Sequence, residues 1–185
     1  MDTSAARSAI FSRIRLARQA GAHSLADGQA LVQAAIRSPQ AGPLPDLAAT
    51  TAEQIRLRFI AQAQKMADTV ETVASMEQVP LAVAQYLSAH GIAPTASGWQ
   101  SLQGLPWQQA GMEFCARKAS PHDTVGITGV FCALAETGSL LLLSGLGTWS
   151  STSLLPETHI AILPASRIVA HMEAAFALVR SERGE

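Results

Sequence analysis

The side chains best suited to chemistry gather in the second half of the chain, between residues 123 and 156. Glu136 stands there between two apolar segments, where a carboxylate is not needed for solubility. A pocket that raises its pKa would make it a nucleophile or a general base, and we predict this catalytic role for it. The structural alternative is that Glu136 caps backbone amides or forms an ion pair with Arg117 or Arg167.

Three segments with small and hydroxyl side chains lie at the ends of expected strands or in the loops beside them, at residues 126–129, 135–139 and 146–153. Ligand sites of parallel α/β sheets form at such strand ends, where amides and hydroxyls hold phosphate or carboxylate groups. The glycines fit neither a dinucleotide-binding fingerprint nor a P-loop. The candidate ligand-binding residues of these loops are Gly126, Thr128, Gly129, Thr137, Gly138, Ser139, Thr148, Ser150, Ser151 and Thr152.

His159 begins a further expected strand and joins the candidate ligand-binding residues, with a purely structural histidine as the alternative. The five histidines show no metal-ligand spacing, so we expect no metal site. Cys115 and Cys132 are too few for a usual iron–sulfur cluster, and we expect no cofactor in this chain. Two thiols among apolar residues fit a reducing compartment, which predicts a cytoplasmic location.

Length and composition favour a compact domain, because the chain has 185 residues, of which 48% are hydrophobic and 15% charged. The net charge of −1 gives no bulk attraction to nucleic acid or to an anionic membrane. No apolar run approaches the roughly 20 residues of a membrane-spanning helix. Arginines are frequent in the first twenty residues, which suits an organellar presequence or an amphipathic first helix. The lack of an apolar signal-peptide core favours the helix.

Helices and strands are expected to alternate, which predicts an α/β fold with a mostly parallel sheet flanked by helices. The expected helices cover residues 4–20, 27–36, 51–67, 75–91, 130–135 and 166–181. The expected strands cover residues 69–74, 92–96, 112–116, 125–128, 140–143 and 159–163. Residues 1–48 form an N-terminal helical region and loop, and residues 49–185 the α/β domain. A turn-rich stretch at 98–111 carries Trp99 and Trp107, which would mark an interface if exposed.

The segments DTVGIT, ALAETGSLLL and SLLPETHIAIL, with a closing helix, resemble the LUD-domain family over residues 125–179. The resemblance implies a fold of the ribose-5-phosphate isomerase, glucosamine-phosphate deaminase and CoA-transferase type, with an N-terminal helical appendage here. CoA transferases of that fold carry a catalytic Glu in a Glu-Asn-Gly segment, to which Glu136-Thr137-Gly138 is similar. This is an analogy of fold, which does not carry the reaction with it.

The family includes partners in a multi-protein system that oxidises L-lactate to pyruvate. The resemblance implies an accessory subunit that works with iron–sulfur partner proteins and binds a small anionic metabolite near Glu136. Iron–sulfur clusters are expected in the partner proteins alone, and neither nucleic acid nor a membrane span is expected. The sequence departs from the family in having no Arg or Lys between Lys118 and Arg167, where many members carry an arginine. The alternatives are a stand-alone enzyme that uses Glu136 on a CoA thioester or sugar phosphate, and a non-catalytic ligand-binding module.

Overall fold

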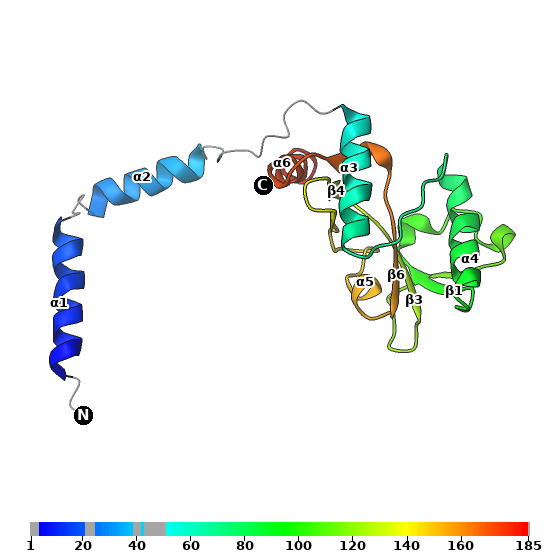
Figure 1. Ribbon diagram of the computed structural model, residues 1–185, viewed down its shortest axis with the longest axis horizontal. Coiled ribbons are helices and arrows are strands. Elements are labelled where there is room, and N and C mark those ends of the chain that lie inside the picture. Colours follow the sequence, from blue (N-terminus) through cyan, green and yellow to red (C-terminus); the bar gives the residue numbers. More distant parts are fainter. Residues whose placement is uncertain (1–3, 21–24, 39–41, 43–50, 185) are drawn as a thin grey trace. The chain divides into compact units, whose positions relative to one another are not determined.

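The computed structural model describes residues 4–20, 25–38, 42 and 51–184, which belong to two units, Met1–Asp46 and Leu47–Glu185 (Figure 1). The first unit contains the helices α1 (Ser4–Ala20) and α2 (Leu25–Arg37), which agree with the two helices expected there. The expected domain boundary between residues 48 and 49 lies outside the described residues. The second unit is an α/β domain built on two small sheets.

The larger sheet has four parallel strands in the order β2-β1-β3-β6. They are β1 (Thr95–Gly98), β2 (Glu113–Ala116), β3 (Val125–Gly129) and β6 (Thr158–Ile162). The α/β fold with a mostly parallel sheet is thereby confirmed. The strand expected at 92–96 begins only at Thr95, because the amide of Ile92 still bonds to Leu87 at the end of a helix and Pro94 has no amide hydrogen.

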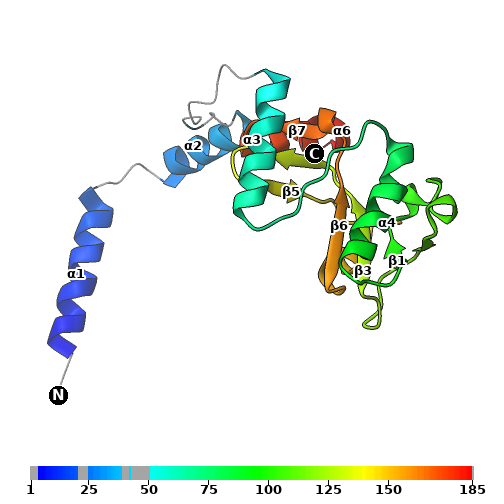
Figure 2. The same cartoon turned by 45° about the vertical axis from the view of Figure 1, so that its right-hand side comes forward.

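The smaller sheet has the order β5-β4-β7, with β5 antiparallel and β7 parallel to β4. Its strands are β4 (Cys132–Leu134), β5 (Ser139–Leu141) and β7 (Ile168–Val169). The helix expected at 130–135 is wrong, because this stretch pairs with strands on both sides and its side chains alternate between two faces. Figure 2 shows β5 and β7 from another angle, apart from the β1, β3 and β6 strands of the larger sheet.

Helices α3 (Ala52–Lys65) and α6 (Met172–Arg183) cover opposite faces of the smaller sheet. From α3, Phe59 and Ala63 pack with Ala133, whereas Ala175 of α6 packs with Leu134. Thr51 caps α3, since its side chain and that of Gln54 form a reciprocal capping box. The last helix begins at Met172 rather than 166, because the 3-10 turn η4 (Ala165–Arg167) and β7 precede it.

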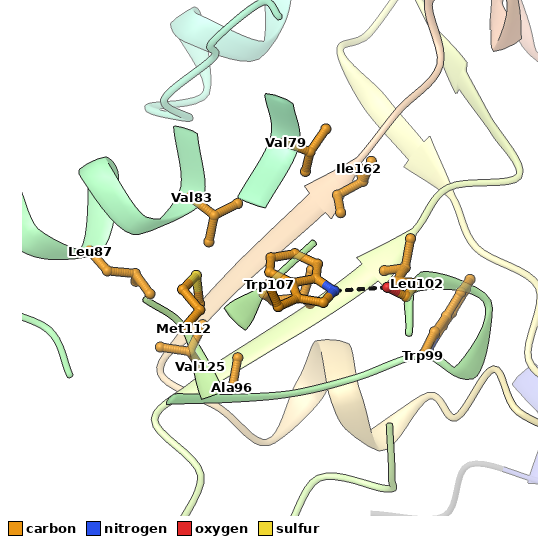
Figure 3. Close-up of a cluster of buried hydrophobic side chains, with 11 residues drawn as sticks. Val79, Val83, Leu87, Ala96, Trp99, Leu102, Trp107, Met112, Val125 and Ile162 are labelled. Atoms are coloured by element: carbon orange, nitrogen blue, oxygen red, sulfur yellow. Dashed lines mark hydrogen bonds between the residues drawn. The ribbon is translucent and has the colours of Figure 1, made fainter. Parts of the chain in front are cut away.

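Helix α4 (Val79–Ala89) packs on one face of the larger sheet, after the 3-10 turn η1 (Met76–Gln78). The main core lies beneath it (Figure 3) and consists of Val79, Val83, Leu87, Ala96, Trp99, Leu102, Trp107, Met112, Val125, Ile127 and Ile162. Trp99 and Trp107 are only 5% and 3% exposed, so the idea that they mark an interface is wrong. The 3-10 turns η2 (Gln100–Leu102) and η3 (Gln108–Ala110) fold them inward.

The strand expected at residues 69–74 does not form, and the segment is irregular. Val70 packs against the cluster around Phe59, whereas Val73 packs against the main core. The pattern of apolar and polar residues at 69–74 suggested a strand. The segment is instead a connector whose apolar side chains contact two separate clusters.

Candidate functional site

The predicted site residues fall on two different sheets. Glu136, Thr137, Gly138 and Ser139 lie in the hairpin between β4 and β5 of the smaller sheet. The others lie on the larger sheet or in the loop before β6, and they are Gly126, Thr128, Gly129, Thr148, Ser150, Ser151, Thr152 and His159. No side-chain hydrogen bond joins the two groups among the residues that the structure describes.

The hairpin is held against α3 through its turn. Gly138 has a φ of 76°, and a Cβ there would lie 2.7 Å from the amide nitrogen of Ala63. The hydroxyl of Thr137 donates to the Ser139 hydroxyl at 2.9 Å and accepts from the Ser139 amide at 3.3 Å. Both hydroxyls are therefore engaged in closing the turn, as in other Ser/Thr turns.

Glu136 is half-buried, and its amide donates to the carbonyl oxygen of Ala170 at 3.0 Å. Its carboxylate makes no hydrogen bond or ion pair within residues 51–184. Arg117 bonds instead to Asp123, with both distances 2.7 Å, and this pair holds the pKa of the Asp123 carboxyl well below its usual range. Arg167 bonds to Glu182 at 2.6 and 3.1 Å. The expectation that Glu136 pairs with Arg117 or Arg167 is thus wrong.

The face of the larger sheet opposite α4 is polar. Because successive residues of a strand point to opposite faces, Ser97, Gly126 and His159 lie side by side on this face in register. Thr128 lies two residues after Gly126, and its Oγ1 is 2.8 Å from Nε2 of His159. Thr128 is fully buried, and His159 is exposed overall at the edge of the sheet.

The short helix α5 (Ser151–Leu154) covers this polar face, in contact with β3 and β6. Gly126 has no side chain to obstruct α5. The carbonyl oxygen of Thr152 lies where a Cβ of residue 126 would be. Thr152 therefore lies directly over Gly126, between the neighbouring positions of Ser97 and His159. We name Ser97, Thr128, Ser151, Thr152 and His159 the hydroxyl layer.

Three hydroxyls of this layer are buried without a hydrogen-bond partner in the described part of the chain, namely Ser97 Oγ, Ser151 Oγ and Thr152 Oγ1. A buried hydroxyl without a partner costs about 1–3 kcal/mol, and such groups usually bind water or a ligand. The layer has no charged carboxylate, ammonium or guanidinium among its five members. Hydrogen bonds from a bound water or from a small ligand would satisfy its free hydroxyls.

The loop that leads into α5 is tied to the residues that follow β1. The amide of Gln100 donates to the carbonyl oxygen of Gly147, and the indole Nε1 of Trp99 donates to the carbonyl oxygen of Trp149, both at 3.1 Å. These bonds fix the approach of α5 to the polar face.

Of the predicted residues, the structure brings together Gly126, Thr128, Thr152 and His159, and Ser151 belongs to α5, which contacts β3 and β6. The other residues predicted on the larger sheet or in the loop before β6 lie outside the hydroxyl layer. Gly129 is on the other face of β3, where a Cβ would lie 3.6 Å from the Trp99 ring; Thr148 closes a turn with Gly145, and Ser150 is exposed.

Sequence analysis missed Ser97, because the expected strand ended at residue 96. The one sequence feature that points to Ser97 is the alternation of small residues in Thr95–Gly98, and this pattern is not a recognisable motif.

The Ser97 hydroxyl has no hydrogen-bond partner in the described residues, and its removal tests the hydroxyl layer. We expect Ser97→Ala to leave the free energy of unfolding unchanged or to raise it by up to about 1 kcal/mol, since it removes a buried hydroxyl without a partner. Thr128→Val removes a hydroxyl that has a partner and should cost about 1 kcal/mol. Urea unfolding of both variants measures the difference. Equal losses of unfolding free energy in the two variants would mean that the Ser97 hydroxyl forms a hydrogen bond in solution.

Although His159 is exposed overall, desolvation of its ring against the sheet lowers its pKa below the usual value, because the imidazolium form is less well solvated there than in water. The unfolded chain then binds more protons than the folded one as the pH falls through about 6.5, so stability falls with it. We expect the free energy of unfolding to drop more steeply between about pH 7 and pH 5 in the wild type than in His159→Gln. Urea unfolding across this range measures it, and parallel pH profiles would contradict the prediction.

Residues 50–184 match the family model described as LUD domain. A "Lactate utilization protein C" of Halalkalibacterium halodurans is 44% identical over 66 residues, which are 36% of this chain and 28% of that protein. The protein of the same name from Bacillus subtilis is 43% identical over 63 residues, or 34% of this chain and 26% of that one. A "Lactate utilization protein B" of Shouchella clausii is 44% identical over 53 residues, or 29% of this chain and 11% of that one.

The aligned segments span about a quarter of the length of the protein C relatives. Among solved structures, a DUF162 family protein from Deinococcus radiodurans superposes with a TM-score of 0.61 at 20% identity. The superposition covers 72% of this chain and 82% of that one. At this identity it shows the α/β fold alone.

Proposed function

The chain belongs to the LUD domain family, and on that premise we propose that it is an accessory subunit of an L-lactate utilisation system. The observation that carries the proposal is an identity of 41–46%, over segments of 58–66 residues, to five proteins named lactate utilization protein C. A protein named lactate utilization protein B also matches, so the shared segment occurs in two components that carry this name.

The reaction we assign to the assembly is oxidation of L-lactate to pyruvate, which releases two electrons. This chain has two cysteines, one buried and one half-buried, and both are free thiols. Iron–sulfur partner proteins would then accept the electrons, with their clusters held by their own cysteines. The subunit would contribute ligand binding or docking of these partners.

For the small anionic metabolite, the hydroxyl layer is the better-supported site. Its three hydroxyls without partners can donate hydrogen bonds to one carboxylate and accept from one hydroxyl. Arg117 and Arg167, which flank this region in the sequence, are each bonded to a carboxylate of their own. A multiply charged ligand such as a CoA thioester or sugar phosphate would lack a cation there, and a monocarboxylate such as lactate or pyruvate suits the layer better.

One observation favours the second candidate, an enzyme that uses Glu136. This half-buried carboxylate has no side-chain partner among the described residues, and a carboxylate left unpaired in a protected position is available for acid–base or nucleophilic work. Glu157 is an exposed glutamate outside the hairpin and offers a matched control.

A thermal-shift comparison separates the two sites. We expect lactate or pyruvate to raise the melting temperature of the wild type and of Glu136→Gln, Glu157→Gln and Ser150→Ala. The shift should be lost in the Ser151→Ala/Thr152→Val double variant, because the orphan hydroxyls are removed. A shift that is lost in Glu136→Gln and kept in the double variant would place the ligand at the hairpin instead.

The proposed role itself is tested in cells. A strain of the native host that lacks this gene should fail to grow on L-lactate while it grows normally on pyruvate. The tagged chain, purified from lactate-grown cells, should carry along iron-containing proteins. Normal growth of the deletion strain on L-lactate, with no iron in the purified material, would refute the role.

A further inference from the structure

Helix α1 (Ser4–Ala20) is amphipathic and strongly basic. Its apolar residues Ala6, Ile10, Ile14 and Ala17 are spaced four, four and three apart, which places them in one stripe along the helix. Ile10 and Ile14 are 58% and 48% exposed, and the neighbouring Phe11 is 47% exposed. Nothing else in the described part of the first unit covers this stripe.

The charges of α1 are arranged around the stripe. The helix contains four arginines and no acidic residue, whereas the whole chain has a net charge of −1. At 100° per residue, Arg13 borders the stripe on one side and Arg7 and Arg18 border it on the other. The guanidinium of Arg7 lies 5.6 Å from the centre of the Phe11 ring, along the edge of the apolar surface. Serines occupy the opposite face, at Ser8 and Ser12.

We propose that α1 lies in the surface of a membrane that is rich in anionic lipids. The apolar stripe would enter the boundary of the acyl chains, and the arginines on both of its sides would reach the lipid phosphates. Nucleic acid would pair with the arginines but would leave the isoleucines and Phe11 in water. The helix lies on the membrane without crossing it, because no helix in the described residues is long and apolar enough to span a bilayer.

Helix α2 (Leu25–Arg37) shows that the pattern is particular to α1. It also exposes apolar residues, with Leu31 and Ile36 at 61% and 67%, but it has one acidic and one basic residue. Its surface offers no electrostatic attraction to a lipid phosphate. The inference about α1 is independent of the proposed role in lactate utilisation.

Vesicle flotation of the full chain tests the proposal, with phosphatidylcholine vesicles that either contain or lack about 30% phosphatidylglycerol. We expect binding to the anionic vesicles alone, weakened at high salt because the charges are screened. Ile10→Asn/Ile14→Asn should weaken binding about tenfold or more, since it makes the stripe polar. The matched control Ser8→Asn/Ser12→Asn places the same residues on the opposite face and should change binding by no more than about twofold.

Three outcomes would overturn the proposal. One is no binding to anionic vesicles, and another is equal binding to both kinds of vesicle. The third is equal binding by the two double variants. If size-exclusion chromatography without vesicles shows a self-association that Ile10→Asn/Ile14→Asn abolishes, and flotation of the wild type fails, the stripe binds protein instead.

Discussion

Trp107→Ala is expected to lower the free energy of unfolding by about 3–5 kcal/mol, the usual cost of removing a buried aromatic side chain. Trp107 is 3% exposed, and its ring stacks on Phe114 with the ring centres 4.7 Å apart. Its Nε1 donates to the carbonyl oxygen of Leu102 at 2.8 Å, as Figure 3 shows. The alanine variant loses the apolar burial, the stacking and this hydrogen bond, and among the described residues the carbonyl of Leu102 keeps only the bond from the Leu105 amide.

Two further variants separate these contributions in urea unfolding. Trp107→Phe retains an aromatic ring but loses the hydrogen bond, and it should cost about 1–2 kcal/mol. Trp149→Ala removes a half-buried indole outside the main core and should cost less than Trp107→Ala. A loss of under about 1 kcal/mol for Trp107→Ala would show that the segment around it is not part of the cooperative core.

The position of Trp107 illustrates what local patterns leave open. The composition of residues 98–111 indicated turns, and the stretch does contain two 3-10 turns. Its tryptophans are nevertheless buried, because the turns fold back beneath α4 and fill the space next to β1 and β3. Turn residues specify local backbone geometry, and they do not say which surface the loop covers.

Elements with strong periodicity or caps were predicted well. The capping box at Thr51 fixes the start of α3, and the strand expected at 125–128 forms as β3, whose first four residues are buried. The stretch 130–135 was not predictable in the same way, since a short apolar run fits a buried helix or a buried strand equally. Its pairing with β5 and β7, whose partner residues lie five to nine and thirty-five positions further along the chain, decided the outcome.

Only some residues of the candidate site could be found from the sequence, because the arrangement of the strands decides which residues meet. The rule that ligand sites gather at the ends of parallel strands led to Gly126 and Thr128, and His159 was added because it begins the next expected strand. The same rule also singled out Glu136, which lies on the other sheet, because β3 leads directly into β4 and carries the chain there. Ser97 lies beside Gly126 only through the register of β1 with β3, which a single sequence does not reveal.

Gly126→Ala should lower the free energy of unfolding by about 2–3 kcal/mol, through overpacking beneath α5. A Cβ at this position would collide with the backbone carbonyl of Thr152 and would lie 2.9 Å from the Pro156 ring. A backbone group cannot rotate away as a flexible side chain can, so α5 has to move off the sheet. Thermal or urea unfolding followed by circular dichroism measures the loss.

Gly129→Ala is the matched control in the same strand. Its Cβ would lie 3.6 Å from the Trp99 ring, an ordinary van der Waals contact, so the free energy of unfolding should change by less than about 1 kcal/mol. Similar losses in the two variants would mean that glycine in β3 serves the backbone itself rather than the close approach of α5. The free energy of unfolding could fall in Gly126→Ala alone, and that variant could also lose the thermal shift with lactate or pyruvate. This result would show that the hydroxyl layer binds its ligand only when α5 packs closely on the sheet. The absence of a side chain at one strand position would then be what lets a four-residue helix complete the site.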